Sequence, residues 1–365
     1  MEKYPILGEK LKNGITEYIY PVEGLEGDNF LALTVKVGSA AEKEDNAGIA
    51  HFVEHAQMSF FDEGEEDYLC SAYTDFYSTT FYFDTKSRGI GKIIKLIQEI
   101  IKGKFLIDFD IEKIRKEVLE EYEKTIYKRS QEDFYFLLEN TEYAGHYSIG
   151  SRQCIHNFSK EDVWKFYETY YLLGNMSITW LGPAEDIMGA GVNWIENLSG
   201  IPGKTELRVL NYPFPTKKIY NQKQKKKGRT SYYFFRKRDQ EADTIDDVLL
   251  SIIEETLNQY VGEIRVEKLY LSCRQEFICI ISMKENTWEE IYEAIKKIPL
   301  IEWTNKYKYF LEKELIGYNC NSLREQLVDS FIFNVQIIEK KADIKRKVAT
   351  LLNVLQIGSV AISKG

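Results

Sequence analysis

Cysteine is scarce in this 365-residue chain, and its spacing limits the kind of site it can build. The five cysteines, at positions 70, 154, 273, 279 and 320, include no C-x-x-C pair. This scatter argues against a cysteine zinc site and against a disulfide framework. It is typical of reduced thiols, and we therefore expect a cytoplasmic protein.

Long apolar runs and an excess of basic residues are also missing. The most apolar helical stretch, residues 93–107, is too polar to span a bilayer, since it contains Lys95, Glu99, Lys102 and Lys104. The segment Met1–Pro5 shows no basic region followed by an apolar one, so no secretory signal is visible. The net charge of −9 argues against nucleic acid as the main partner.

The composition that is present favours a folded protein of two domains. Hydrophobic residues make up 44% of the chain and aromatic residues 14%, enough for folded cores, and the length exceeds that of most single cores. Strand and helix patterns follow one another in both halves. Residues 200–228 hold three prolines and a basic run, which indicates a linker. We predict an α+β protein with domains at 1–205 and 206–365.

The segment His51-Phe52-Val53-Glu54-His55 is the most informative motif. It contains two of the four histidines, four positions apart, with a glutamate between them. On a helix, positions i and i+4 lie on one face, so both imidazoles could bind one tetrahedral Zn²⁺. Glu54 borders the same face and could take a proton from a metal-bound water. This H-x-x-E-H order is the inverzincin signature. The alternative is a pair of helix histidines that make ordinary hydrogen bonds.

Four segments resemble the pitrilysin/insulysin family of zinc peptidases, which includes the mitochondrial processing peptidases. Residues 37–42 (VGSAAE) resemble the family's GSRDE-type turn, and residues 47–55 (AGIAHFVEH) resemble GLAHFLEH. Residues 72–83 resemble NAYTS…TVYYF, and residues 159–182 resemble the strand and helix that close the family's N-terminal domain. The match covers about half of the chain. It implies two related domains, each a mostly antiparallel sheet packed with helices, that form one half of a clamshell.

The resemblance also implies a third zinc ligand. The family's EKERGVVLEEI segment corresponds to residues 112–122 here, which places the ligand on Glu121 and leaves Glu120 and Glu117 as alternatives. One Zn²⁺ per chain would then be bound by His51, His55 and Glu121 with an open fourth position, which is the catalytic arrangement. The family's second carboxylate on this helix, two turns earlier, is replaced by Ile114.

The family's strand NAYT corresponds to Ser71, Ala72 and Tyr73 followed by Thr74, with serine in place of the asparagine. The resemblance implies that Ser71, Ala72 and Tyr73 bind the substrate backbone. The segment between His55 and this strand is shorter than in the family.

Relatives in the family also use an arginine and a tyrosine from a second domain that closes over the site. Arg265 and Tyr270 lie in the nearest stretch, but the glycine of the family pattern is missing and the two stand too close together. We therefore expect a heterodimer with a related subunit that supplies this element, and a homodimer as the second possibility.

Two functions remain open at this point. The first is a zinc endopeptidase that hydrolyses peptides or small proproteins, including a ribosomally made peptide that it matures. The second is a noncatalytic subunit that holds peptide without cleaving it. The complete set of His51, Glu54, His55 and Glu121 favours the first.

Overall fold

The computed structural model describes most of the first 305 residues and scattered residues after them. The described parts are 8–22, 25, 27–59, 67–126, 135, 137–139, 141–191, 193–210, 219–224, 229–237, 245–272, 275–284, 286–305 and single turns or strands between 324 and 362. Contacts divide the chain into two compact units at Pro213 and Phe214, and Leu327–Asn334 returns to the first unit. The predicted boundary at 205/206 lies before this point, and the relationship of each unit to a family domain stays a prediction.

The first unit is built on a six-stranded sheet with the order β1-β2-β6-β3-β5-β4. The strands are β1 (Glu9–Lys10), β2 (Thr16–Pro21), β3 (Asp28–Val35), β4 (Tyr68–Thr74), β5 (Thr79–Lys86) and β6 (Met176–Gly182). All neighbours pair antiparallel except β2 and β6. β4 is an edge strand, and its side chains alternate between half-buried and exposed up to Thr74 because one face alone is covered.

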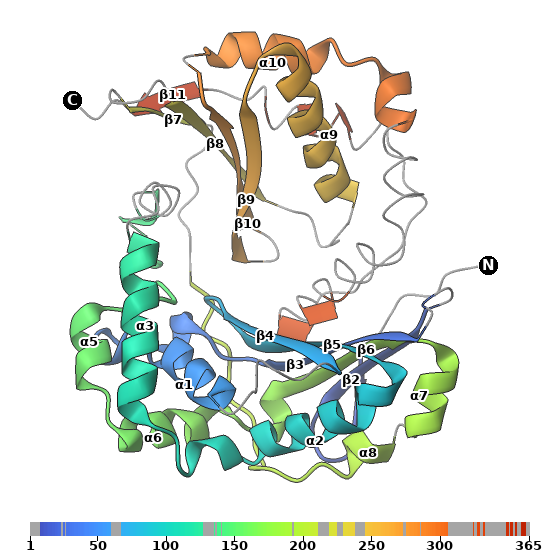
Figure 1. Ribbon diagram of the computed structural model, residues 1–365. Helices are drawn as coiled ribbons and strands as arrows, with labels where there is room; N and C mark the ends of the chain where they lie inside the picture. The colour runs from blue at the N-terminus through green and yellow to red at the C-terminus, as the bar shows by residue number, and fades with distance from the viewer. Residues whose placement is uncertain are drawn as a thin grey trace. The chain divides into compact units, whose positions relative to one another are not determined.

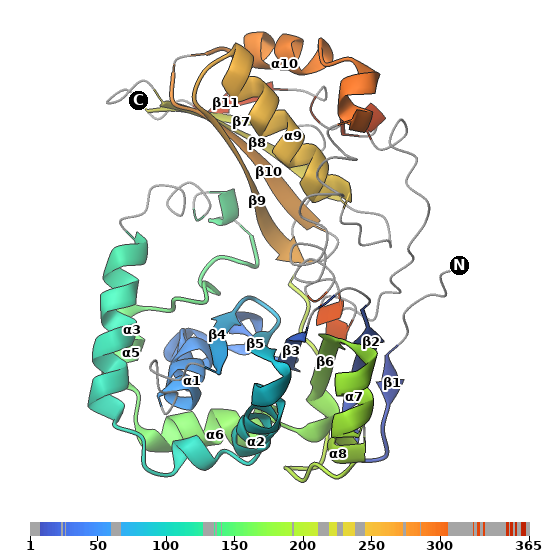
Figure 2. The ribbon, with the colours of Figure 1, turned by 45° about the vertical axis from the view of Figure 1, so that its right-hand side comes forward.

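Helices cover one face of this sheet (Figures 1 and 2). They are α1 (Ile49–Met58), α2 (Ile90–Ile101), α3 (Ile111–Ile126), α5 (Arg152–Asn157), α6 (Lys160–Tyr170), α7 (Ala184–Ala190) and α8 (Asn193–Glu196). α6 begins with a capping box, since Ser159 and Asp162 bond reciprocally to each other's backbone N–H. No helix in the described residues is long and apolar enough to cross a membrane.

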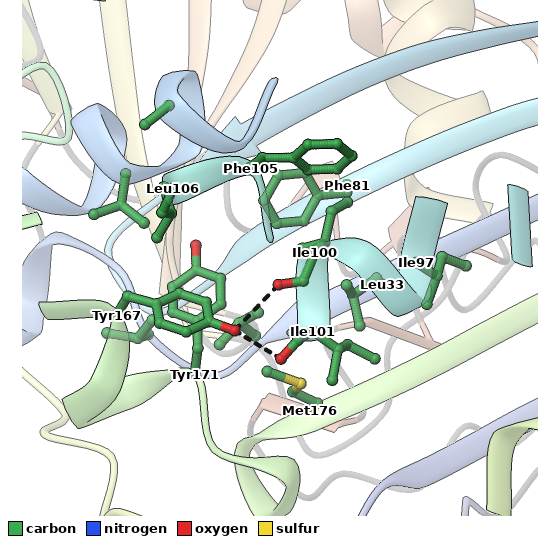
Figure 3. Packing of buried hydrophobic residues seen from close by; sticks show 14 of the residues in the cluster. Leu33, Phe81, Ile97, Ile100, Ile101, Phe105, Leu106, Tyr167, Tyr171 and Met176 are labelled. Carbon is green, nitrogen blue, oxygen red and sulfur yellow. Dashed lines mark hydrogen bonds between the residues drawn. The ribbon is translucent and has the colours of Figure 1, made fainter. Parts of the chain in front are cut away.

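The core lies between these helices and the sheet. Figure 3 shows part of it, where Tyr167 of α6 and Tyr171, the residue just after α6, stack at 4.8 Å beside Ile100 and Ile101 of α2. The Tyr167 hydroxyl donates to the carbonyls of both isoleucines, at 3.2 and 2.6 Å, which satisfies the carboxyl end of α2. The apolar packing therefore fixes the helical layer that carries the site.

The second unit has a five-stranded sheet with the order β11-β7-β8-β10-β9. Its elements are β7 (Ile219–Gln224), β8 (Arg229–Lys237), α9 (Ile245–Tyr260), β9 (Ile264–Ser272), β10 (Gln275–Ser282), α10 (Trp288–Lys296) and β11 (Ser359–Ile362). β11 and β7 pair in parallel and the other neighbours antiparallel. The core around Trp288 and Trp303 packs α9 and α10 on the sheet.

These two sheets confirm the predicted α+β class with mostly antiparallel pairing. The linker predicted at 200–228 was wrong for residues 219–224, which form β7. Its last four residues are polar (Asn221, Gln222, Lys223 and Gln224), so its sequence has no apolar alternation, and its pairing with β8 decides its conformation. The shortened segment after His55 falls largely on residues 60–66, outside the described residues. The clamshell arrangement stays a prediction.

Candidate metal centre

The amino end of α1 is fixed by a glycine and a buried carboxylate. Gly48 adopts φ 97°, and a Cβ there would lie 2.8 Å from Gly150 Cα, so only glycine fits. The Glu42 carboxylate accepts hydrogen bonds from the backbone N–H of Gly48 at 2.8 Å and of Ala50 at 2.9 Å. Burial raises the pKa of Glu42 to about 8, against the lowering effect of these two bonds.

From this start, α1 presents one chemical face. His51, Glu54, His55 and Met58 follow the i, i+3, i+4, i+7 spacing and all line the same cavity, of about 370 Å³. The opposite face, which includes Phe52 and Val53, is fully buried in the core. The buried packing of one face therefore turns the other toward the cavity.

α3 brings a third donor to this face. Ile114, Val118 and Glu121 are spaced by four and three residues and so share one side of α3. The two apolar residues are fully buried in the first unit's core, and α3 contacts α1 (Figure 1). The Arg115 guanidinium donates to the Ile155 and Phe158 carbonyls, which anchors α3 to the segment that leads into α6.

The two imidazoles and the Glu121 carboxylate meet at one point. Glu121 Oε2 lies 3.2 Å from His55 Nε2 and 3.5 Å from His51 Nε2, and the possible ligand atoms all lie within 4.8 Å of one another. Donors bound at about 2.0–2.2 Å to a tetrahedral Zn²⁺ are separated by roughly 3.4 Å. The residues therefore fit a zinc ion of the His₂Glu type.

The charges at this point are strongly coupled. Hydrogen bonds from His51 and His55 hold the pKa of Glu121 far below its usual range. Burial lowers the pKa of His55, but the hydrogen bond to Glu121 and the nearby carboxylates outweigh it, and the net shift is upward. Such a carboxylate stays ionised at neutral pH, as a metal ligand must.

The other glutamates of α3 are placed differently. Glu117 lies 3.9 Å from His55 Nδ1, the ring nitrogen that does not point at Glu121, and Glu120 lies 3.9 Å from Lys116 on the exposed side. Glu121 is therefore the α3 glutamate that approaches both Nε2 atoms.

One buried polar atom lacks a partner. His51 Nδ1 has no hydrogen-bond acceptor in the described part of the chain. A histidine that binds metal through Nε2 usually donates its Nδ1–H to an acceptor, often a carboxylate. Ile114, seven residues before Glu121 on the same side of α3, is fully buried and offers none.

Glu54 is buried at the edge of the cavity. Its Oε2 accepts a hydrogen bond of 2.6 Å from Thr74 Oγ1, the last residue of β4. No role was predicted for Thr74, although it follows directly after the predicted substrate-binding residues. The strand that resembles NAYT includes Thr74, but nothing in the sequence indicated that its hydroxyl contacts Glu54 of α1.

The predicted substrate-binding residues lie on the edge strand β4. Ala72 and Tyr73 line the cavity, whereas the exposed Ser71 does not. The cavity wall also includes Thr125 of α3 together with Tyr135, Ser148 and Ile149, which the sequence did not reveal. In the second unit, Arg265 is exposed on β9, and the Tyr270 side chain falls outside the described residues.

Comparison with known proteins identifies a family for the part of the chain that carries this site. Residues 29–147 match the family model described as Insulinase (Peptidase family M16). Residues 29–147 are thus an insulinase-family region. His51, Glu54, His55 and Glu121 all lie within this insulinase-family region.

Two relatives that share this insulinase-family region are each less than 30% identical to this chain. The chain is 28% identical over 195 residues to the chloroplastic stromal processing peptidase of Oryza sativa subsp. japonica, which covers 49% of this chain and 15% of the relative. It is 29% identical over 197 residues to a zinc protease PQQL-like protein of Arabidopsis thaliana, which covers 48% of this chain and 21% of the relative. The matched region is thus about half of this chain but only a small share of each of the two relatives.

The fold similarity extends further than the sequence similarity. The crystal structure of a protease from Helicobacter pylori matches 99% of this chain and 100% of its own chain, with a TM-score of 0.68 and 18% identity. At that identity the match shows a shared fold along the whole chain.

Proposed function

We propose that this chain is a zinc metalloendopeptidase in which His51, His55 and Glu121 bind one Zn²⁺ and Glu54 is the general base. The observation that carries the proposal is the convergence of His51 Nε2, His55 Nε2 and Glu121 Oε2 beside a buried glutamate in one cavity. Three protein ligands with an open position are typical of catalytic zinc, whereas structural sites use four.

The chemistry divides between the metal and the chain. When bound, zinc lowers the pKa of a coordinated water and polarises the scissile carbonyl. Glu54 would take the proton of the attacking water and pass it to the leaving amine, since it is the glutamate that lines the cavity together with His51, His55 and Glu121 without being a ligand. The free edge of β4 at Ser71, Ala72 and Tyr73 pairs with an extended peptide backbone, as edge strands do.

The substrate class is a peptide or small proprotein, including a ribosomally made peptide that needs maturation. An extended peptide can reach the cavity along β4, because Ala72 and Tyr73 belong to both. The zinc protease named among the relatives supports the reaction type.

We further propose a heterodimer. Arg265, which is exposed, and Tyr270 belong to one strand, β9, and do not reproduce the arginine–tyrosine element of the family, so a related subunit supplies it. A homodimer is the second arrangement. The noncatalytic alternative draws its support from His51 Nδ1, which has no partner among the described residues and so leaves zinc less firmly held.

The test is peptide cleavage by the zinc-loaded chain, measured alone and with the product of the neighbouring gene, using a mixture of internally quenched peptides. We expect weak cleavage alone, strong cleavage with the partner, and loss of both on adding a chelator. Cleavage that survives complete zinc removal would overturn the metallopeptidase assignment. Zinc binding without cleavage under any of these conditions would favour the noncatalytic subunit.

A further inference from the structure

We propose that Thr74 is a positioning residue that holds the Glu54 carboxylate in its working orientation, an inference that rests on the proposed function of Glu54. Neither the motif nor the family model assigns Thr74 a role. Four observations carry the assignment: the bond itself, its burial, the fixed backbone next to Thr74 and the absence, in the described part of the chain, of another donor to Glu54.

The bond is short and buried. Thr74 Oγ1 lies 2.6 Å from Glu54 Oε2, and the two residues are 3% and 6% exposed. The threonine hydroxyl donates its proton in this bond and the Glu54 carboxylate oxygen accepts it. A hydroxyl–carboxylate bond of this length belongs to the charge-assisted class, which is stronger than a neutral hydrogen bond.

The turn after β4 fixes the position of Thr74. The Asp75 carboxylate accepts from the backbone N–H of Tyr77 and Ser78, and the Asp75 N–H donates to the Ser78 carbonyl at 2.9 Å. The Asp75 carbonyl in turn accepts from the Ser39 N–H at 3.0 Å. The backbone next to Thr74 is thus tied on both sides.

The neighbouring strand β5 also contacts the Thr74 hydroxyl group. Thr79 pairs with Thr74 across the hairpin, and the two hydroxyl oxygens lie 3.3 Å apart. Thr79 Oγ1 donates its proton to the Val37 carbonyl at 3.0 Å. The single proton of Thr74 therefore remains available for Glu54.

Within the described residues, Thr74 is the one hydrogen-bond donor to Glu54. A glutamate side chain has three rotatable torsions, so its carboxylate needs at least one fixed contact to keep a defined direction. With Oε2 held by Thr74, the orientation of the other oxygen is set, and that oxygen is free to receive a proton. A misdirected base loses rate because proton transfer requires hydrogen-bond distance.

The first experiment compares Thr74→Ala with Thr74→Ser, which differ by the hydroxyl alone. In the zinc-loaded chain with its partner, we expect Thr74→Ala to lower kcat on the order of tenfold or more with KM and zinc content unchanged. Thr74→Ser should stay within about threefold of the wild type. The matched control is Thr80→Val, which removes a buried threonine hydroxyl of the same hairpin that bonds to Thr34 at 3.2 Å. It should leave kcat unchanged.

The second experiment uses the metal-free chain and needs no activity. In a double-mutant cycle of Thr74→Ala and Glu54→Ala, the unfolding equilibrium constant of the double variant should differ from the product of the single effects by about tenfold. The Thr80→Val and Glu54→Ala pair should be multiplicative. A multiplicative Thr74 cycle, or equal kcat for Thr74→Ala and Thr74→Ser, would overturn the inference. A wild type that cleaves nothing would instead count against the proposed function, while the cycle still tests the Thr74–Glu54 pair.

Discussion

At the residue scale, the site depends on which nitrogen of each histidine faces Glu121. Both Nε2 atoms do, so both Nδ1 atoms are left for other contacts. His55 Nδ1 has Glu117 at 3.9 Å, whereas His51 Nδ1 is buried and unpartnered among the described residues. The two histidine ligands are therefore held unequally, and His51 is held less firmly than His55.

This inequality predicts a gain of function. Ile114→Glu places a carboxylate on the side of α3 that also carries Val118 and Glu121, within the core that α3 shares with α1. We expect this carboxylate to accept from His51 Nδ1–H. We expect zinc to bind about tenfold more tightly, the lower end of what such supporting contacts contribute. The measurement is competition for zinc with a chelator of known affinity. The control, Ile114→Met, keeps the position apolar and should bind zinc like the wild type. Equal affinity in the two variants would show that position 114 does not support His51.

At the element scale, α1 is held at its amino end by Glu42. Burial of the carboxyl raises its pKa from 4.5 to about 8 in the folded chain. A raised carboxyl pKa means that the folded state favours the protonated form. The stability from this group is then fully present below the unfolded pKa and is lost as the pH rises through the folded one.

The resulting prediction concerns the metal-free chain between pH 5 and pH 8. The free energy of unfolding should fall over this range in the wild type, with Glu42 accounting for a few kcal/mol of the decrease. Glu42→Gln is close in shape to the protonated acid but does not titrate, so its decrease should be smaller by that amount. Chemical denaturation at both pH values measures the difference. Parallel pH profiles for the two proteins would contradict the assignment.

The elements of the first domain could largely be predicted from sequence, since each carries a local signal. The capping box at Ser159 marks the start of α6, and the alternating residues of 68–86 mark the β4–β5 hairpin. β7 could not be predicted, because its polar residues gain their strand conformation from pairing with β8. Local sequence patterns predict an element when its own apolar side chains pack in the core. They do not predict a strand whose conformation depends on pairing with a neighbour.

At the scale of the whole molecule, the candidate site was predictable in its ligands and not in its supports. His51 and His55 follow from spacing on one helix, and Glu121 from resemblance to a family segment. Thr74 and Glu42 both lie in segments that resemble the family, but the resemblance does not say which groups they contact, which are 20 positions away for Thr74 and 6 and 8 for Glu42. Such contacts become visible only when the sheet and the helical layer are assembled.

The central claim is that His51, His55 and Glu121 hold zinc while Glu54 performs the proton transfer. The most direct measurement determines zinc content and peptide cleavage on the same samples of wild type, Glu54→Gln and Glu121→Gln. We expect Glu54→Gln to keep one zinc per chain and lose cleavage by about a hundredfold or more, the usual contribution of a general base. Glu121→Gln should lose both zinc and cleavage, since it removes a ligand. Full cleavage by Glu54→Gln, or full zinc retention by Glu121→Gln, would contradict this account.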